Sequence, residues 1–288
     1  MASLSLVWGL AFYLIAIGLR SFPPITLVAF RLITGAAVLY VLMRWKGLSL
    51  PKEPRWWLYF SVLSILGNLL PFTLIAWAET RIPSSQAGLI MALMPISTML
   101  LAHYFVPHEQ LTQRRVIGVL LGFLGVTILV GATALEGLGG ELIWGQLACV
   151  VATFAYAVNA VYAKRLPKIN GLVVAAGSLL AGSLIWTPVA MIVDQPWTLV
   201  MSADSLWAAA ALGVLGTGIA TWAYFVLLSD CGPNFVSSIN YIVPAIAFAA
   251  GVFLLSEPAD ASQFAGLIAI CLGIAISRTK QPQRQNVQ

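Results

Sequence analysis

Residues 57 to 78 read WLYFSVLSILGNLLPFTLIAWA, a stretch that contains no charged side chain. A helix needs about 20 apolar residues to cross the hydrocarbon core of a bilayer, so this stretch is long enough to span it. Similar runs lie near residues 4–19, 27–43, 84–106, 116–134, 142–163, 172–193, 205–228, 234–255 and 262–277. The sequence therefore predicts ten transmembrane helices with short connections that leave no room for a soluble domain.

The composition of the chain supports this interpretation. Of its 288 residues, 60% are hydrophobic and 9% are charged, whereas soluble domains carry charge on about a quarter of their residues. Membrane β-barrels would show short alternating strands instead of long unbroken runs, so the expected class is an all-α membrane protein. The net charge of +5 does not indicate a nucleic-acid partner, because the basic residues lie in short loops between the apolar runs.

The loop charges predict the topology. If the N-terminus is cytoplasmic, twelve basic residues fall in inside loops and the C-terminal tail, and only Arg20 and Arg81 fall outside. This bias follows the positive-inside rule and supports an even number of spans with both termini in the cytoplasm of a bacterial cell. The acidic residues assigned to the outside loops are Glu79, Glu136, Glu141, Asp194, Asp204, Glu257 and Asp260.

The chain also contains a weak internal repeat at a shift near 149 residues. Leu63–Gly67 aligns with Leu212–Gly216, and Pro95 aligns with Pro244. Because each copy has five predicted spans, the second copy must enter the membrane in the opposite orientation. The expected domains are residues 1–135 and residues 136–288, and inverted repeats of this kind are typical of secondary transporters.

Several short motifs recur in the two halves. The first half contains Leu6-Val7-Trp8-Gly9, Pro95, Glu109-Gln110-Leu111-Thr112 and the glycines Gly118, Gly122 and Gly125; the second contains Pro244, Ser256-Glu257-Pro258, Gly266 and Gly273. Over nearly the whole chain these motifs resemble the EamA-type drug/metabolite transporters, and more loosely the bacterial exporters of aromatic amino acids. The second half departs from the family pattern, because Pro258 is followed by Ala-Asp instead of a Gly-Glu turn. The resemblance implies ten helices around a central cavity that opens alternately to each side.

Polar and aromatic side chains inside the predicted spans are the candidates for binding a solute. Such groups are costly in lipid, so they are expected to face the bundle interior or a wet cavity. The alternative is that they form hydrogen bonds between helices only. The candidate substrate-binding residues are Trp8, Phe12, Asn68, Trp77, Tyr156, Asn159, Thr217, Thr221, Tyr224, Ser237, Asn240 and Tyr241.

Arg31 is the basic residue that lies clearly within a span. It either binds a substrate carboxylate or extends its side chain to the outer membrane interface. Pro95 and Pro244 each remove a backbone donor in mid-span, which predicts either gating bends or fixed kinks. The glycines of the fifth and tenth spans suit close helix contact, as a rigid packing face or a dimer face. Glu257 either caps the helix that follows it or takes part in coupling.

These features favour a secondary transporter that exports small metabolites, with aromatic or hydrophobic amino acids as the expected cargo. Cationic drugs, nucleotide sugars and an intramembrane enzyme are the alternatives; no nucleophile–base pair or carboxylate cluster at membrane depth supports the enzyme. No phosphate-binding G-x-x-x-x-G-K-[S/T] motif occurs, so ATP is not the direct energy source. No acidic residue stands clearly at mid-span, which favours facilitated transport. No cofactor, metal or nucleic acid is expected, and the working unit is a monomer or a homodimer in the lipid bilayer.

Overall fold

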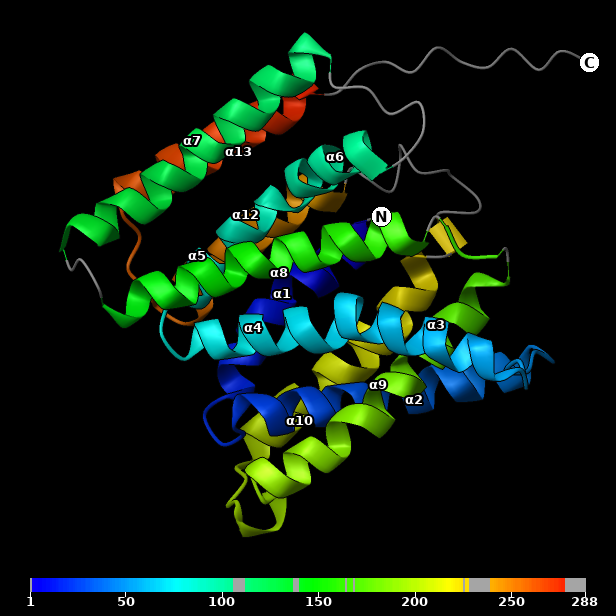
Figure 1. Ribbon diagram of the computed structural model, residues 1–288. Helices are drawn as coiled ribbons and strands as arrows, with labels where there is room; N and C mark the ends of the chain where they lie inside the picture. Colours follow the sequence, from blue (N-terminus) through cyan, green and yellow to red (C-terminus); the bar gives the residue numbers. More distant parts are fainter. Residues whose placement is uncertain are drawn as a thin grey trace, which may run out of the picture.

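The computed structural model describes residues 2–105, 112–136, 140–163, 165–167, 169–224, 226–227 and 239–277. Within these ranges every regular element is helical, and the helices form an elongated bundle (Figure 1). The elements are α1 (Ala2–Gly18), α2 (Pro24–Trp45), α3 (Pro54–Ser64), η1 (Ile65–Leu69), α4 (Leu70–Glu79), α5 (Ser84–Ile90), η2 (Met91–Leu93), α6 (Met94–Phe105), α7 (Gln113–Glu136), α8 (Glu141–Ala163), α9 (Gly171–Val193), η3 (Pro196–Thr198), α10 (Ala203–Ala211), η4 (Leu212–Ile219), α12 (Ile239–Leu254) and α13 (Ala261–Ser277).

Several of these elements join into continuous membrane-length helices. The predicted run at 57–78 becomes α3, η1 and α4, which together span Pro54–Glu79. In the described residues, six helices are long and apolar enough to cross a membrane, and four further apolar helices are shorter. The protein is therefore a multi-pass membrane protein, and a crossing by each of the four shorter helices stays a prediction.

Local sequence signals explain where the helices begin. Pro24 and Pro54 stand at the first helical position of α2 and α3, where the missing N–H has no intrahelical partner to lose. The Asn170 side chain accepts a hydrogen bond of 2.9 Å from the Leu172 N–H at the start of α9. Ser202 accepts one of 3.2 Å from the Ser205 N–H at the start of α10. Both are the side-chain caps expected of Asn and Ser at a helix N-terminus.

The glycines predicted to allow close helix contact lie where α7 packs against α13. These two helices lie side by side along one edge of the bundle (Figure 1). A Cβ atom at Gly125 would lie 2.7 Å from the Gly266 carbonyl oxygen, and one at Gly273 would lie 2.5 Å from the Gly118 carbonyl oxygen. No side chain fits at either distance, so the glycines let the two backbones touch and confirm the packing prediction.

One end of the bundle is held together by polar contacts between segments far apart in sequence. It carries the connections at residues 19–23, 80–83, 194–202 and 255–260, and we call it the latched end (left and lower left in Figure 1). The Asp194 carboxylate accepts hydrogen bonds from the Thr26 N–H at 2.9 Å and from the Thr26 hydroxyl at 2.7 Å. The Ser21 and Ser202 hydroxyls lie 3.1 Å apart. These contacts join the start of α2 to the end of α9.

Glu257 forms a second set of polar contacts at this end, which we call the latch. Its Oε1 accepts from the Ser84 N–H and its Oε2 from the Ser85 N–H, both at 2.8 Å. The sequence had favoured a cap on the following helix, α13; the structure corrects this, because the carboxylate caps α5, 172 residues away. A backbone turn with a left-handed Ser256 (φ 56°) precedes Glu257.

Candidate solute-binding site

Two wide helical turns, η1 and η4, mark the middle of the bundle. Both are π-helical, a geometry that is rare and is found frequently at functional sites. Each turn carries a glycine that contacts a polar side chain of another helix. The Trp8 indole N–H donates to the Gly216 carbonyl at 3.2 Å, and a Cβ atom at Gly67 would lie 2.6 Å from the Asn159 amide nitrogen. The missing Cβ atom at Gly67 therefore lets Asn159 pack against η1, and the Gly216 carbonyl holds Trp8 against η4.

Arg31 lies at the centre of this region. Only 7% of the residue is exposed, so its side chain does not reach the membrane interface and the snorkelling alternative is wrong. Its Nε donates to the Thr217 hydroxyl at 2.6 Å, and its guanidinium carbon lies 3.6 Å from the centroid of the Phe72 ring. The Thr217 hydroxyl in turn donates to the Leu212 carbonyl at 3.1 Å within η4. The guanidinium is thus fixed in position by one hydrogen bond and one aromatic face.

The charge on Arg31 has no direct counter-ion in the part of the chain that the structure describes. The ion pairs found there join Arg55 to Glu53 and Arg81 to Glu141. A buried cation is costly unless it is paired, and a planar guanidinium is well suited to hold a carboxylate by two parallel hydrogen bonds. Within these ranges the Arg31 guanidinium is buried without an ion-pair partner.

Aromatic and amide groups of α1 and α8 interact with this cation or lie against the two π-helical turns. Tyr156 of α8 is close enough to Arg31 for the two to interact electrostatically. Asn159, one turn further along α8, has a buried Oδ1 atom with no partner among the described residues. The Trp8 and Tyr224 rings lie with their centroids 5.8 Å apart. The site thus combines one positive charge, an unsatisfied amide and several ring faces.

The remaining predicted site residues have no contact with Arg31 among those that the structure gives. Phe12 is buried where α5 packs against α12, beside Gly88. Asn68 lies on η1, and Thr221 follows η4; both are half-buried. Ser237 lies outside the described residues, and the side chains of Asn240 and Tyr241 are not among those described.

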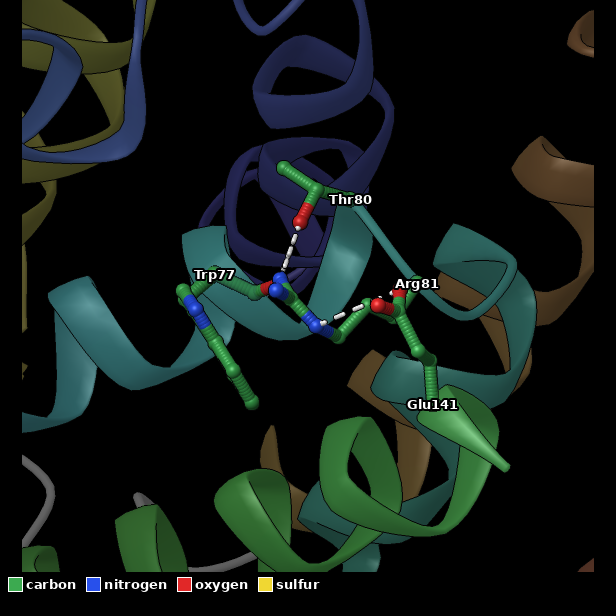
Figure 2. A network of polar contacts seen from close by, with 4 residues as sticks. All are labelled: Trp77, Thr80, Arg81 and Glu141. Carbon is green, nitrogen blue, oxygen red and sulfur yellow. Dashed lines mark hydrogen bonds and ion pairs between the residues drawn. The ribbon is translucent and has the colours of Figure 1, made fainter.

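Trp77 lies at the latched end instead of beside Arg31. The Arg81 guanidinium covers its ring at 3.7 Å, and Arg81 Nη1 donates to the Trp77 carbonyl at 3.2 Å and to the Thr80 hydroxyl at 2.7 Å. Arg81 Nε lies 3.8 Å from a Glu141 carboxylate oxygen (Figure 2). This group joins the α4–α5 turn to the start of α8.

The two mid-span prolines have different local effects. Pro95 follows the 3₁₀ turn η2, which interrupts the helix between α5 and α6. Pro244 is buried within α12, which continues as an α-helix on both sides of it. The two equivalent prolines therefore do not produce the same backbone in this conformation.

The sequence profile of the EamA-like transporter family matches residues 1–131 and 143–279, which is most of the chain. The chain belongs to the EamA-like transporter family. This confirms the resemblance drawn from the motifs, and it identifies a membrane transporter.

Curated relatives of this EamA family member match over almost their whole length. An "Uncharacterized inner membrane transporter YedA" of Escherichia coli K12 is 24% identical and covers 95% of this chain and 88% of its own length. A "Probable amino-acid metabolite efflux pump" of Salmonella typhimurium is 27% identical, with 94% and 91% covered. A solved crystal structure superposes with a TM-score of 0.68 at 23% identity, covering 96% of this chain and 98% of the other; it supports the fold alone.

Two residues of this EamA transporter were missed as site candidates. Phe72, which stacks on Arg31, lies four residues after the candidate Asn68, and Glu79 lies seven residues after Phe72. This spacing places all three on one helical face, so the periodicity contained the signal. Glu79 had been counted among the outside loop charges; the structure corrects this, because it ends α4 and both carboxylate oxygens are buried.

Proposed function

We propose that this EamA-family protein is a secondary carrier that exports amino acids with aromatic or hydrophobic side chains by alternating access. The observation that carries the proposal is Arg31, a fixed and buried cation that lies against the Phe72 ring and has no ion-pair partner among the described residues. An amino-acid carboxylate would pair with the guanidinium, and its side chain would contact the aromatic groups around it. The efflux pump of Salmonella typhimurium, whose printed name refers to amino-acid metabolites, supports the same class of cargo.

We further propose ten spans arranged as two inverted repeats, 1–135 and 136–288. The helix contacts support this arrangement because two of the pairings have a counterpart in the other half: α1 with α12 corresponds to α8 with α6, and α3 with α9 corresponds to η4 with α2. The π-helical turns η1 and η4 also fall at equivalent positions of the repeat. The two segments matched by the family profile flank the proposed boundary.

The proposed orientation places both termini in the cytoplasm and the latched end on the outside. The loop charges support it, since Arg20 and Arg81 are the basic residues assigned to that end. Pro95 and Pro244 are proposed as the points where spans bend during the cycle. A nucleotide sugar is disfavoured because its phosphates would need several converging basic residues, and Arg31 is the one buried cation found in the described part of the chain.

Counterflow in proteoliposomes tests the proposal. Vesicles are preloaded with unlabelled phenylalanine, and the entry of labelled phenylalanine or tryptophan is followed. Accelerated entry is expected for aromatic amino acids and not for sugars or cationic dyes. No acceleration with aromatic, aliphatic or hydroxyl amino acids, in protein that is shown to be folded, would remove amino acids as the cargo.

Variants within the site then test its location. Asn159→Ala and Tyr224→Ala are expected to reduce counterflow while the protein still inserts, because Asn159 lies against Gly67 of η1 and Tyr224 packs with Trp8, which donates to Gly216 of η4. Tyr40→Ala provides a matched control, since Tyr40 is an exposed tyrosine on α2. Wild-type flux in both site variants would contradict this assignment of the site.

A further inference from the structure

Glu79 is an acidic side chain whose two carboxylate oxygens are enclosed and have no hydrogen-bond partner among the described residues. It is the last residue of α4, and both of its carboxylate oxygens are buried without a donor in the ranges that the structure describes. An ionised carboxylate in such a place loses its hydration without replacement, which is far more costly than burying the neutral acid. There is also no exposed surface at the two oxygens for a solute to contact, so the ligand that fits them in this conformation is a proton.

The charged and titratable groups around Glu79 belong to three segments of the chain. Arg31 of α2 and Cys149 of α8 interact with it electrostatically, and so does the Glu257 carboxylate from the α12–α13 connection. The helix α1, which also contacts α4, contains Tyr13 but no Asp, Glu, Lys, Arg or His.

Arg81 is the basic residue nearest to Glu79 in sequence, but it does not form an ion pair with the Glu79 carboxylate. The polar contacts of Arg81 are with Trp77, Thr80 and Glu141, and its guanidinium lies over the Trp77 ring (Figure 2). The Nε of Arg31 is held by Thr217. Neither arginine lies within ion-pair distance of the Glu79 carboxylate, so neither neutralises it directly in this conformation.

Glu257 links the charge state of Glu79 to the hydrogen bonds at the start of α5. The two backbone N–H groups that Glu257 accepts, at 2.8 Å each, belong to Ser84 and Ser85 at the start of α5, directly after the turn that follows Glu79. These two hydrogen bonds hold the α12–α13 connection against the start of α5. A second negative charge on Glu79 would repel Glu257 and weaken its hold on α5.

We propose that Glu79 is a proton-binding site that controls the latched end: it is protonated when Glu257 caps α5, and it releases its proton when this end opens. This inference rests on the proposed carrier cycle for its consequence, because closure of the latched end then takes up a proton. Because the proton is taken up and released on the latched side, the rate of transport becomes dependent on the pH on that side, without net movement of protons across the membrane. Arg31 supplies the positive charge that stabilises ionised Glu79 after the latch separates.

A distance measurement without any solute tests the site. Spin labels are placed at Thr80 and Ala259, two exposed positions in the α4–α5 turn and the α12–α13 connection, in a protein whose three cysteines are replaced. Raising the pH is expected to lengthen the distance between the labels, because ionised Glu79 repels Glu257. Glu79→Gln, which cannot ionise, is expected to keep the short distance at every pH.

Glu53→Gln is the matched control, because Glu53 is an exposed glutamate paired with Arg55; it should respond to pH as the wild type does. A wild-type distance that does not change with pH would overturn the proposal, and so would a wild-type response in Glu79→Gln. If Glu79→Gln does not fold, infrared difference spectra of the wild type decide instead. A carboxyl C=O band that disappears at high pH together with the lengthening supports the site, and a lengthening without such a band contradicts it.

A transport assay in proteoliposomes is the second test of the proposal. The rate of phenylalanine counterflow in proteoliposomes is expected to change with the pH on the latched side in the wild type, and Glu79→Gln is expected to lose this dependence. Counterflow whose rate does not depend on this pH would contradict the proposed control of the latched end while leaving the proposed carrier intact. Failure of counterflow together with a pH-dependent latch would have the opposite meaning: the proton site stands, and the proposed cargo is wrong.

Discussion

Replacing Glu257 with Gln should release the latched end. In the wild type the carboxylate accepts two backbone hydrogen bonds of 2.8 Å, from Ser84 and Ser85. Hydrogen bonds to a charged group contribute about 1.5–3 kcal/mol each. The Gln side chain keeps one neutral acceptor and turns an N–H donor toward the other backbone N–H. The net loss is therefore about 2–4 kcal/mol of latch stability.

This loss converts into a measurable change in the population of the open end. Because about 1.4 kcal/mol corresponds to a factor of ten, the open fraction should rise by roughly 30-fold to several hundred-fold. A cysteine in place of Ser85, which is fully buried beneath the latch, serves as the reporter. Its rate of labelling by a small hydrophilic thiol reagent should rise by the same factor when Glu257→Gln is added, as long as closing is faster than labelling.

Asp260→Asn is the matched control for this experiment. Asp260 lies three residues further along the same connection and is exposed, so its replacement also removes one negative charge but leaves the latch intact. An unchanged labelling rate in Glu257→Gln, or an equal increase in Asp260→Asn, would refute the assignment of Glu257 as a latch.

Three further predictions concern the site and the packing of the bundle. Arg31→Lys keeps the positive charge but loses the hydrogen bond to Thr217, so the Kd for an aromatic amino acid, measured by binding of the labelled solute, should rise by about tenfold or more. Thr217→Val should reduce counterflow for the same reason, whereas Thr127→Val, at an exposed threonine bonded only within its own helix, should not. Gly273→Leu should lower the Tm in detergent, because a Cβ atom there would lie 2.5 Å from the Gly118 carbonyl oxygen; an unchanged Tm would mean that α7 and α13 are not in backbone contact.

The predicted helices agree closely with the observed ones where apolar runs end at prolines or charged residues. The run predicted at 27–43 lies within α2, Pro24–Trp45, and the run at 172–193 matches α9, Gly171–Val193. Such agreement is expected, because a helix in lipid must satisfy its own backbone and its limits follow from local composition. The crossing of the shorter helices and their inverted arrangement stay predictions.

The site was predicted less completely than the helices. Helical spacing placed Thr217, Tyr224 and Asn159 among the candidates, and the structure brings Thr217 into contact with Arg31. The same spacing could not show that Trp77 lies beneath Arg81 at the latched end. A periodic pattern gives the face of one helix, but it does not give the depth at which that face meets its neighbours.

The sequence by itself determined the class of the protein, because apolar length and the scarcity of charge decide which segments enter lipid. It also determined the family, through motifs that recur along most of the chain. Only the tertiary structure decided that Arg31 stacks on Phe72, that Glu257 caps α5 and that Glu79 is enclosed without a partner. Each of these depends on which helices pack together, since burial and hydrogen bonding of a side chain are set by neighbours that can lie more than 170 residues away.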